Sequence, residues 1–457
     1  MKRTQMDYDL VIKNGTIVTA SQSYPADIGI LGEQIAVIDQ NLHGRAEIDA
    51  QGKMVTPGAI DIHVHMEMPI GDIVSSDDFF TGTRAASYGG TTAIVDFVEP
   101  EPDESMLEAL TNRRAIADPK VTIDYGLHMT IGPAEIEKLD QLPEVCDAGC
   151  PSFKLYMAYG FCLSDSELME AMEAIRDVNG LPVIHTENWA VITALIDRSL
   201  SAGNVSPAWH PRCRPAVMEG EAAGRAIDIA TLVGTRLHIF HITCEDVIER
   251  LSVARVKGIP VTGETCPQYL FLTQDVYDKP GVEGALPVCS PPIRSKKSQE
   301  ALWRALGRGD LQIVSTDHCP FTRAEKATGL GDFSKIPGGV PSVEMRFPSL
   351  YSSGVVPGRI TPNQWVDICC TTPARIAGFD RKGVIAVGFD ADIVIFDPDE
   401  RVVLSGETLH EEVDWTPYDG LVIQGWPQVT ISRGEVIVDN GVFSGRAGRG
   451  HFVNRHF

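Results

Sequence analysis

The stretch Gly58-Ala59-Ile60-Asp61-Ile62-His63-Val64-His65-Met66 decides how the rest of the chain is interpreted. Its apolar run, bounded by Pro57 and Gly58, is typical of a buried strand. Residues two positions apart in a strand point to the same side, so His63 and His65 would present two imidazoles together. This pair suits one borderline metal ion such as zinc, although the same spacing also occurs by coincidence.

Strand-like runs alternate with helix-like segments through the middle of the chain. Ser164-Asp165-Ser166-Glu167 is a capping box, and residues 77–87 and 219–232 have helical periodicity. Eight strand–helix units predict an α/β fold, a (β/α)8 TIM-type barrel with its active site at the C-terminal ends of the strands. A doubly wound sheet is the alternative, less favoured because eight units close naturally into a ring. The eight predicted strands are residues 59–62, 92–97, 121–128, 153–155, 181–185, 237–241, 259–263 and 311–316.

Both ends of the chain have the pattern of short β-strands. Near the start, residues 9–13 lead through Asn14-Gly15, a strong hairpin signal, into residues 16–19. Similar runs follow at 28–31 and 35–38, and again near the other end at 391–396 and 429–438. We expect the two ends to form one small β-sandwich domain, with two separate sheets as the alternative. The predicted division is 1–56 and 388–457 for the sandwich and tail, and 57–387 for the barrel.

Composition excludes several classes of protein. The chain of 457 residues has 62 acidic and 39 basic residues and a net charge of −23, whereas a nucleic-acid binder needs a basic face. No apolar run approaches the ~20 residues of a membrane helix, and the opening residues do not form a secretory signal. The ten cysteines are scattered without paired CxxC motifs. We expect a cytoplasmic protein with free thiols and no nucleic-acid or membrane partner.

Side chains able to bind metals occur at five of the eight predicted strands. A single histidine at such a place is more often a core or loop residue. Six candidates on the catalytic face of a barrel instead favour a functional site. Four of them are among the twelve histidines of the chain, and the set is His63, His65, Lys154, His185, His241 and Asp317.

The number of candidate ligands favours two metal ions over one. Two ions about 3.5–4 Å apart can ionise a bridging water, and an anionic bridge offsets their charge. A lysine ammonium has no lone pair to offer a metal. Lys154 therefore fits only if neutral or modified, for example as the carbamate formed when carbon dioxide adds to its amine. The alternative is an ordinary barrel lysine paired with an acid.

Further motifs carry a resemblance to a known family. They lie at residues 58–65, 77–83, 89–92, 153–159, 185–188, 214–215, 263–269, 289–292 and 316–319. With these motifs, essentially the whole chain resembles the D-hydantoinase/dihydropyrimidinase family of cyclic amidohydrolases, within the amidohydrolase superfamily. The resemblance implies hydrolysis of a small cyclic amide, and a homotetramer or homodimer.

The resemblance also implies two divalent metal ions, usually zinc, with manganese or cobalt accepted by related enzymes. One ion would be held by His63, His65 and Asp317, and the other by His185 and His241. An N6-carboxylated Lys154 would bridge the two ions together with a hydroxide.

The resemblance assigns the remaining steps to three residues. The hydroxide would attack the ring amide carbonyl, and Asp317 would move its proton to the leaving nitrogen. Tyr159 would hydrogen-bond the carbonyl oxygen and stabilise the developing negative charge. The backbone of Ser290 would bind the ring amide edge.

One position departs from the family pattern. The family usually has Pro-Asn-Gly where this chain has Pro337-Gly338-Gly339, so Gly338 stands at a substrate-binding asparagine. If backbone groups make the contact, glycine keeps it, with a more mobile loop. If the amide side chain makes the contact, substrate affinity or choice changes. We favour the backbone contact, because a ring amide edge pairs well with peptide groups.

The loop after the histidine pair bears on the choice of ring. Relatives that open acidic or strongly polar rings, the dihydroorotases and allantoinases, tend to carry an arginine there. This chain instead has Met66-Glu67-Met68-Pro69-Ile70. The apolar residues of this loop are Met66, Met68 and Ile70. Together with Phe97-Val98 and Phe161 they predict a pocket for a ring substituent, with packing of the loops against the barrel as an equal alternative.

The expected reaction is therefore opening of a hydantoin or 5,6-dihydropyrimidine ring to an N-carbamoyl amino acid. An allantoinase- or dihydroorotase-like hydrolase is one alternative. A non-catalytic scaffold homologue, resembling proteins that have lost metal ligands, is the other, and the six filled ligand positions disfavour it.

Overall fold

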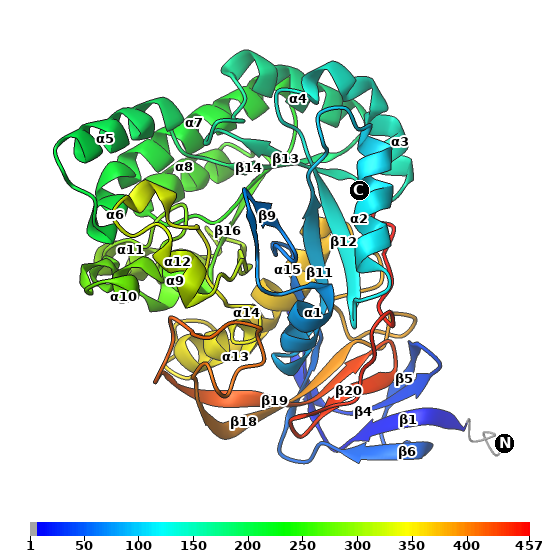
Figure 1. The fold of residues 1–457 in the computed structure, drawn as a ribbon. Helices are drawn as coiled ribbons and strands as arrows, with labels where there is room; N and C mark the ends of the chain where they lie inside the picture. The colour runs from blue at the N-terminus through cyan, green and yellow to red at the C-terminus, as the bar shows by residue number, and fades with distance from the viewer. Residues whose placement is uncertain (1–6) are drawn as a thin grey trace.

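The ring predicted from the middle of the chain is present in the computed structural model, which describes residues 7–457 (Figure 1). Eight parallel strands pair in chain order, so each neighbour in the sheet is the next strand in the sequence. The predicted barrel is confirmed, and the doubly wound alternative is wrong. The strands are β8 (Ala59–Asp61), β11 (Thr91–Val98), β12 (Asp124–Thr130), β13 (Ser152–Tyr156), β14 (Leu181–His185), β15 (Leu237–Ile239), β16 (Val261–Thr265) and β17 (Ile313–Val314).

The first and last barrel strands meet just beyond their regular ends. Val64 and His318 form a parallel bridge. The amide of His65 donates to the carbonyl of His318 at 2.8 Å, and the amide of Asp317 donates to the carbonyl of His63 at 2.9 Å. The seam that closes the ring is therefore formed by the backbone of predicted ligands, which fixes their positions relative to one another.

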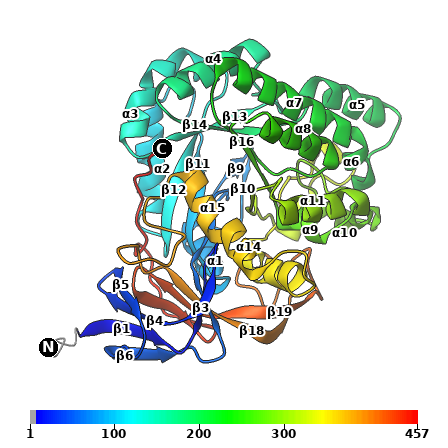
Figure 2. The ribbon, with the colours of Figure 1, turned by 180° about the vertical axis from the view of Figure 1, so that it is seen from behind.

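Helices cover the outside of the ring (Figures 1 and 2). The capping box predicted at Ser164 is present, because its side chain accepts from the amide of Glu167 at the start of α4. No helix among residues 7–457 is long and apolar enough to cross a membrane. The longer helices are α1 (Phe79–Tyr88), α2 (Met106–Ala117), α4 (Asp165–Asp177), α5 (Trp189–Ser201), α7 (Ala216–Val233), α8 (Glu245–Val256) and α11 (Lys296–Arg308). The shorter ones are α3 (Leu142–Asp147), α6 (His210–Cys213), α9 (Pro267–Phe271), α10 (Val282–Ala285), α12 (Arg323–Ala327), α13 (Arg346–Leu350), α14 (Pro362–Val366) and α15 (Thr372–Ala377).

The two ends of the chain build one sandwich beneath the barrel (Figure 1). Its larger sheet has the order β21-β20-β19-β18-β7-β2-β3, so strands from both ends share it, and the smaller sheet has the order β5-β4-β1-β6. Ile393 pairs with Pro57 where the two ends meet. The alternative of two separate sheets from the two ends is therefore wrong. The strands are β1 (Tyr8–Lys13), β2 (Thr16–Val18), β3 (Ser23–Pro25), β4 (Asp27–Leu31), β5 (Gln34–Asp39), β6 (Gly44–Asp49), β7 (Met54–Pro57), β18 (Ile393–Val403), β19 (Val422–Ser432), β20 (Glu435–Asp439) and β21 (Val442–Phe443).

The hairpin predicted at Asn14-Gly15 is wrong. β1 pairs with β4 and β6, whereas β2 pairs with β3 and β7, so the chain crosses from one sheet to the other. Asn14 adopts the positive φ of 62° that the motif favours. The two flanking strands nevertheless bury Ile12 and Ile17 in the same core between the sheets. Burial of these apolar faces outweighs the local turn preference.

The end of the ring opposite the predicted ligands is closed by the end of the chain. Residues of α15 join the apolar cluster inside the ring, and Val453 and Phe457 pack against that cluster. The buried Arg455 guanidinium donates to the carbonyl of Ala377 at 3.0 Å and to the hydroxyl of Ser152 at 3.0 Å. The C-terminal tail thus docks on its own barrel.

Candidate active site

The six predicted metal ligands line one cavity of about 600 Å³ at the C-terminal ends of the barrel strands. Their places in the fold explain why they meet. Parallel strands present all their C-terminal ends at one edge, so residues far apart in sequence converge there. His63 and His65 follow β8, Lys154 lies in β13, His185 ends β14, His241 follows β15 and Asp317 follows β17.

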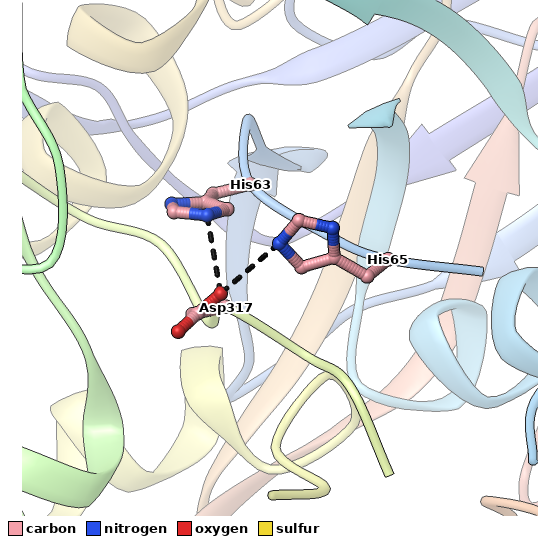
Figure 3. A group of neighbouring side chains, drawn as sticks. All are labelled: His63, His65 and Asp317. Carbon is pink, nitrogen blue, oxygen red and sulfur yellow. Dashed lines mark ion pairs between the residues drawn. The ribbon is translucent and has the colours of Figure 1, made fainter. Parts of the chain in front are cut away.

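His63 and His65 point at the same carboxylate oxygen of Asp317 (Figure 3). Their Nε2 atoms lie 3.1 and 3.2 Å from Asp317 Oδ1. Burial alone would raise the pKa of Asp317, but the neighbouring imidazoles hold it well below its usual value. The carboxylate is therefore ionised and its oxygens are available as ligands.

These three residues fit a divalent cation. One ligand atom from each lies within 4.8 Å of the others. The Nδ1 of His65 is buried without a hydrogen-bond partner. Two imidazole nitrogens and a carboxylate oxygen are a donor set that zinc prefers.

A second pair of imidazoles faces the same cavity. His185 Nδ1 lies 2.9 Å from His241 Nε2, and His185 Nε2 lies 2.8 Å from Glu187 Oε2. Burial lowers the pKa of both imidazoles well below its usual value, so both are neutral. Because the Glu187 carboxylate accepts the Nε2 proton of His185, Nδ1 carries a lone pair, as a metal ligand requires.

Lys154 lies on the same wall, with its amine beside two aromatic rings. Its Nζ is 4.3 Å from the ring centre of Phe240 and 4.8 Å from that of Tyr156. Burial lowers the pKa of Lys154 to about 7. Asp317, Glu264 and Glu99 act on it through their charge and oppose this shift, so the choice between a modified lysine and one paired with an acid stays a prediction. A neutral amine has a lone pair that can react with carbon dioxide.

Two glutamates that orient predicted ligands were missed by sequence reasoning. Glu264, in β16, accepts from His63 Nδ1 at 2.5 Å and lies 3.4 Å from His238 Nε2. Burial alone would raise the pKa of Glu264, but the His63 and His238 imidazoles hold it below its usual value. Glu187 orients His185 in the same way, by accepting a hydrogen bond from its Nε2. The available signal was that each glutamate stands one or two residues after a predicted barrel strand, at the edge where the predicted ligands meet.

Three predicted site residues adopt left-handed backbone conformations. Tyr159, His241 and Asp317 have φ values of 71°, 39° and 54°. Such conformations cost of order 1–3 kcal/mol in a non-glycine residue, and they cluster where a function requires a particular side-chain direction. This strain lies at the cavity wall, independently of the side-chain pattern that identified these residues.

The predicted substrate-binding residues Tyr159, Ser290 and Gly338 also line the cavity. Burial raises the pKa of Tyr159 to about 12, so its hydroxyl keeps its proton and can donate a hydrogen bond. A side chain added at Gly338 would meet nothing within 4 Å. The departure from the family pattern therefore does not result from crowding at this position.

The predicted apolar pocket is formed in part. Met68, Ile70 and Phe161 line the cavity, as do Trp189 and Ile336, which sequence reasoning did not include. The other members have different contacts. Met66 is buried against Gly82, Phe97 stacks on His65 with ring centres 4.5 Å apart, and Val98 is buried in the barrel core. For these three residues the packing interpretation holds.

A second acidic cluster, outside the cavity, holds a lysine. Asp124, Asp390 and Asp392 bring carboxylate oxygens within 4.8 Å of one another. The Nζ of Lys382 lies 2.7, 3.2 and 2.7 Å from these three carboxylates. The cluster is therefore a buried ion-pair group that joins the barrel to the sandwich.

Comparisons with known proteins agree with the fold. The amidohydrolase family profile matches residues 54–437. A D-hydantoinase from Geobacillus stearothermophilus is 45% identical over 97% of this chain and 96% of its own. The structure of a D-hydantoinase from Bacillus sp. AR9 is 45% identical with a TM-score of 0.96, covering 98% of this chain and 99% of its own. That of a dihydropyrimidinase from Brevibacillus agri is 43% identical with a TM-score of 0.96, covering 97% and 98%. The chain belongs to the amidohydrolase family, and within it to the cyclic amidohydrolases of the D-hydantoinase/dihydropyrimidinase group.

Proposed function

We propose that this protein hydrolyses the ring amide of a hydantoin or 5,6-dihydropyrimidine to an N-carbamoyl amino acid. The observation that carries the proposal is the convergence of two ligand groups on one cavity. One group is His63, His65 and Asp317, and the other is the facing pair of His185 and His241. Together with Lys154, whose lowered pKa makes the neutral amine accessible near pH 7, these groups provide the donors for two divalent ions.

Two divalent ions, most simply zinc, with manganese or cobalt as alternatives, would supply a bridging hydroxide as nucleophile and polarise the ring carbonyl. Lys154 would become an anionic ligand shared by the two ions through reaction with carbon dioxide. The neutral Lys154 amine adds to carbon dioxide, one proton leaves, and the N6-carboxylate that results offers two oxygens. Glu187 and Glu264 fix the tautomers of His185 and His63, so that the opposite ring nitrogen carries the lone pair.

The remaining residues act on the ring. The ionised Asp317 accepts the proton of the nucleophile and returns it to the leaving ring nitrogen as the carbon–nitrogen bond breaks. Tyr159 donates a hydrogen bond to the carbonyl oxygen as negative charge develops on it. Backbone groups of Ser290 and Gly338 hold the amide edge of the ring.

The cavity wall favours a ring that bears an apolar substituent. Met68, Ile70 and Phe161 provide apolar surface beside the ligand groups. The cation on this wall, Arg214, is already bound to Glu187 at 2.5 Å, and Glu99 adds an acid nearby. Apart from Lys154, the cavity lining formed by residues 7–457 therefore offers an anionic ring such as dihydroorotate only an arginine that already has an acidic partner. The cytoplasmic location, the homotetramer or homodimer, and the division at residues 56 and 387 stay predictions.

A spectrophotometric ring-opening assay tests the proposal. Dihydrouracil, hydantoin, D- and L-phenylhydantoin, dihydroorotate and allantoin would be compared on metal-loaded and chelated protein, with metal content measured. Asp317→Ala should lose about 10²–10⁴-fold in rate, because it removes a general acid–base group. Asp197→Ala is the matched control, since Asp197 is exposed on α5.

Opening of hydantoins or dihydropyrimidines that requires both the metal and Asp317 supports the proposal. Turnover of dihydroorotate or allantoin alone would replace the proposed substrate with that of the alternative hydrolases. Absence of both activity and bound metal would favour the scaffold homologue.

A further inference from the structure

Lys326, in α12, is a fully buried cation outside the metal-ligand groups. Its Nζ donates to the carbonyls of Val288 at 2.8 Å, Pro337 at 2.7 Å and Gly339 at 2.7 Å. A lysine ammonium has three N–H groups, so these three bonds use its complete donor capacity. All three acceptors are backbone carbonyls.

The three carbonyls belong to the two segments that line the cavity at Ser290 and Gly338. Val288 comes two residues before Ser290, and Pro337 and Gly339 stand on either side of Gly338. The amide of Gly339 also donates to the Val288 carbonyl at 3.0 Å. The ammonium of Lys326 is therefore the point at which the two segments are joined.

The peptide groups of Ser290 and Gly338, which line the cavity, take no part in these hydrogen bonds. Among residues 7–457, neither the amide nor the carbonyl of Ser290 or Gly338 makes a backbone hydrogen bond. Lys326 binds the carbonyls on both sides of Gly338, which leaves the donor and acceptor of Gly338 for a ligand. Unpaired peptide groups at a cavity wall are costly unless water or a ligand pairs with them.

An acidic partner does not account for a cation at this place in the described part of the chain. No carboxylate within the described part of the chain lies within 4.0 Å of Lys326. The aromatic rings of Phe321 and Trp415 have centres 5.9 Å from its Nζ. The hydrogen bonds of the ammonium go to the two backbone segments, and removing it would leave their buried carbonyls without this donor.

We propose that Lys326 is a positioning residue, whose ammonium sets the spacing of the Ser290 and Gly338 segments so that their peptide groups bind the amide edge of the ring. The proposal rests on the proposed function, because it assigns a role in binding the substrate of the same site. Lys326 acts through these backbone segments and touches neither the ring nor the metal ligands.

The charge state of Lys326 gives the arrangement a dependence on pH. Burial lowers the pKa of Lys326 to about 7, with the thiols of Cys289 and Cys319 opposing the shift. His210, whose Nε2 lies 2.8 Å from the carbonyl of Cys289, is a third titratable group that interacts with it. A neutral amine has two donors and a lone pair, so one of the three carbonyls would lose its hydrogen bond.

Amide exchange on the metal-loaded protein without substrate tests the positioning directly. In Lys326→Met, the Gly339 amide and the peptides covering 286–291 and 336–341 should exchange about tenfold faster, because a buried hydrogen-bond group is left unpaired. Residues 165–177 of α4 are the internal reference. Lys335→Met is the matched control on the same loop, since the Lys335 side chain is 75% exposed.

Kinetics on the same variants separate this inference from the proposed function. Lys326→Met should raise KM for hydantoin about tenfold, with kcat within about twofold and metal content unchanged, because ring binding weakens but the nucleophile does not change. If the wild type opens no ring, the proposed function fails. If the wild type is active and the folded variant matches it in exchange and KM, the positioning role is overturned.

The wild type alone decides the question if Lys326→Met does not fold. Protection of the two segments relative to α4 would be compared between about pH 6 and about pH 8.5, across the titration of a lysine buried in this way. A fall of about threefold or more, confined to the two segments, supports the proposal. An equal change in the segments and in α4 overturns it.

Discussion

Replacing Gly339 with alanine would create a steric clash with Cys319, two residues after Asp317 in the chain. An added Cβ at Gly339 would lie 2.8 Å from Cys319 Cβ and still closer to its carbonyl oxygen, whereas ordinary contact begins at 3.4 Å. Gly339 also has a φ of 145°, which side chains rarely adopt. The substitution therefore combines a steric clash with backbone strain.

The magnitude follows from these two contributions. Overpacking costs about 1–3 kcal/mol, and the unfavourable φ costs a similar amount. To restore ordinary contact, the backbone at Cys319 must move by roughly 0.6–1.2 Å, and Asp317 lies two residues away. Because a misplacement of about 1 Å in a catalytic group can cost about 10²-fold in rate, we expect kcat to fall by up to that factor.

The assay compares melting temperature and ring-opening rate in two glycine variants. Gly388→Ala is the matched control: Gly388 has a φ of 90°, but an added Cβ would meet nothing within 4 Å. It should lower the melting temperature by a few degrees and leave the rate unchanged, whereas Gly339→Ala should lower both. A Gly339→Ala protein with wild-type rate and stability would refute the reasoning.

Three further changes have defined outcomes. Gly338→Asn should lower KM about two- to fivefold, since a side chain fits there and reduces the mobility of the loop; a higher KM would mean that it occupies space needed by the ring. Lys382→Met should lower the free energy of unfolding by about 3–5 kcal/mol, because it removes the cation that three buried aspartates share and leaves only Arg433 beside Asp124 and Arg381 beside Asp390. Denaturant titration against Lys257→Met would contradict this if the two variants agreed. Burial raises the pKa of Glu411 from 4.5 to about 8, against the opposing charge of His318. The folded chain therefore holds a proton that the unfolded chain releases between these values, so stability falls as pH rises through that window. Glu411→Gln should flatten the fall in melting temperature there, and an unchanged slope would contradict the assignment.

The convergence of the predicted ligands on one cavity could be foreseen because strand ends in a barrel have a fixed geometry. His185 and Asp317 are far apart in sequence, yet the alternation of strands and helices is enough to bring them to one edge. The same alternation does not specify how side chains pack within that edge. Phe97 therefore stacks on His65 and does not contribute to the predicted apolar pocket.

Two features could not be predicted from the sequence, for different reasons. Asn14-Gly15 has the local signal of a hairpin, but the pairing of its flanking strands is decided by distant partners such as β6 and β7. Lys326 lies in a five-residue helix where a lysine is expected at the surface. Its partners are backbone carbonyls, which have no side-chain identity to recognise in a sequence.

The shared sheet of the sandwich has a consequence for synthesis on the ribosome. β7 ends at Pro57 and its antiparallel partner β18 begins at Ile393, so roughly 340 residues are made between them. At about 5–20 residues per second, the early strands wait roughly 15–70 s for the partner that completes their sheet. During that time β7 has an open edge able to pair with another chain. A circularly permuted chain that begins at β8 and joins the two old ends would remove the delay, and its yield of folded protein at high expression would measure what the native order of synthesis costs.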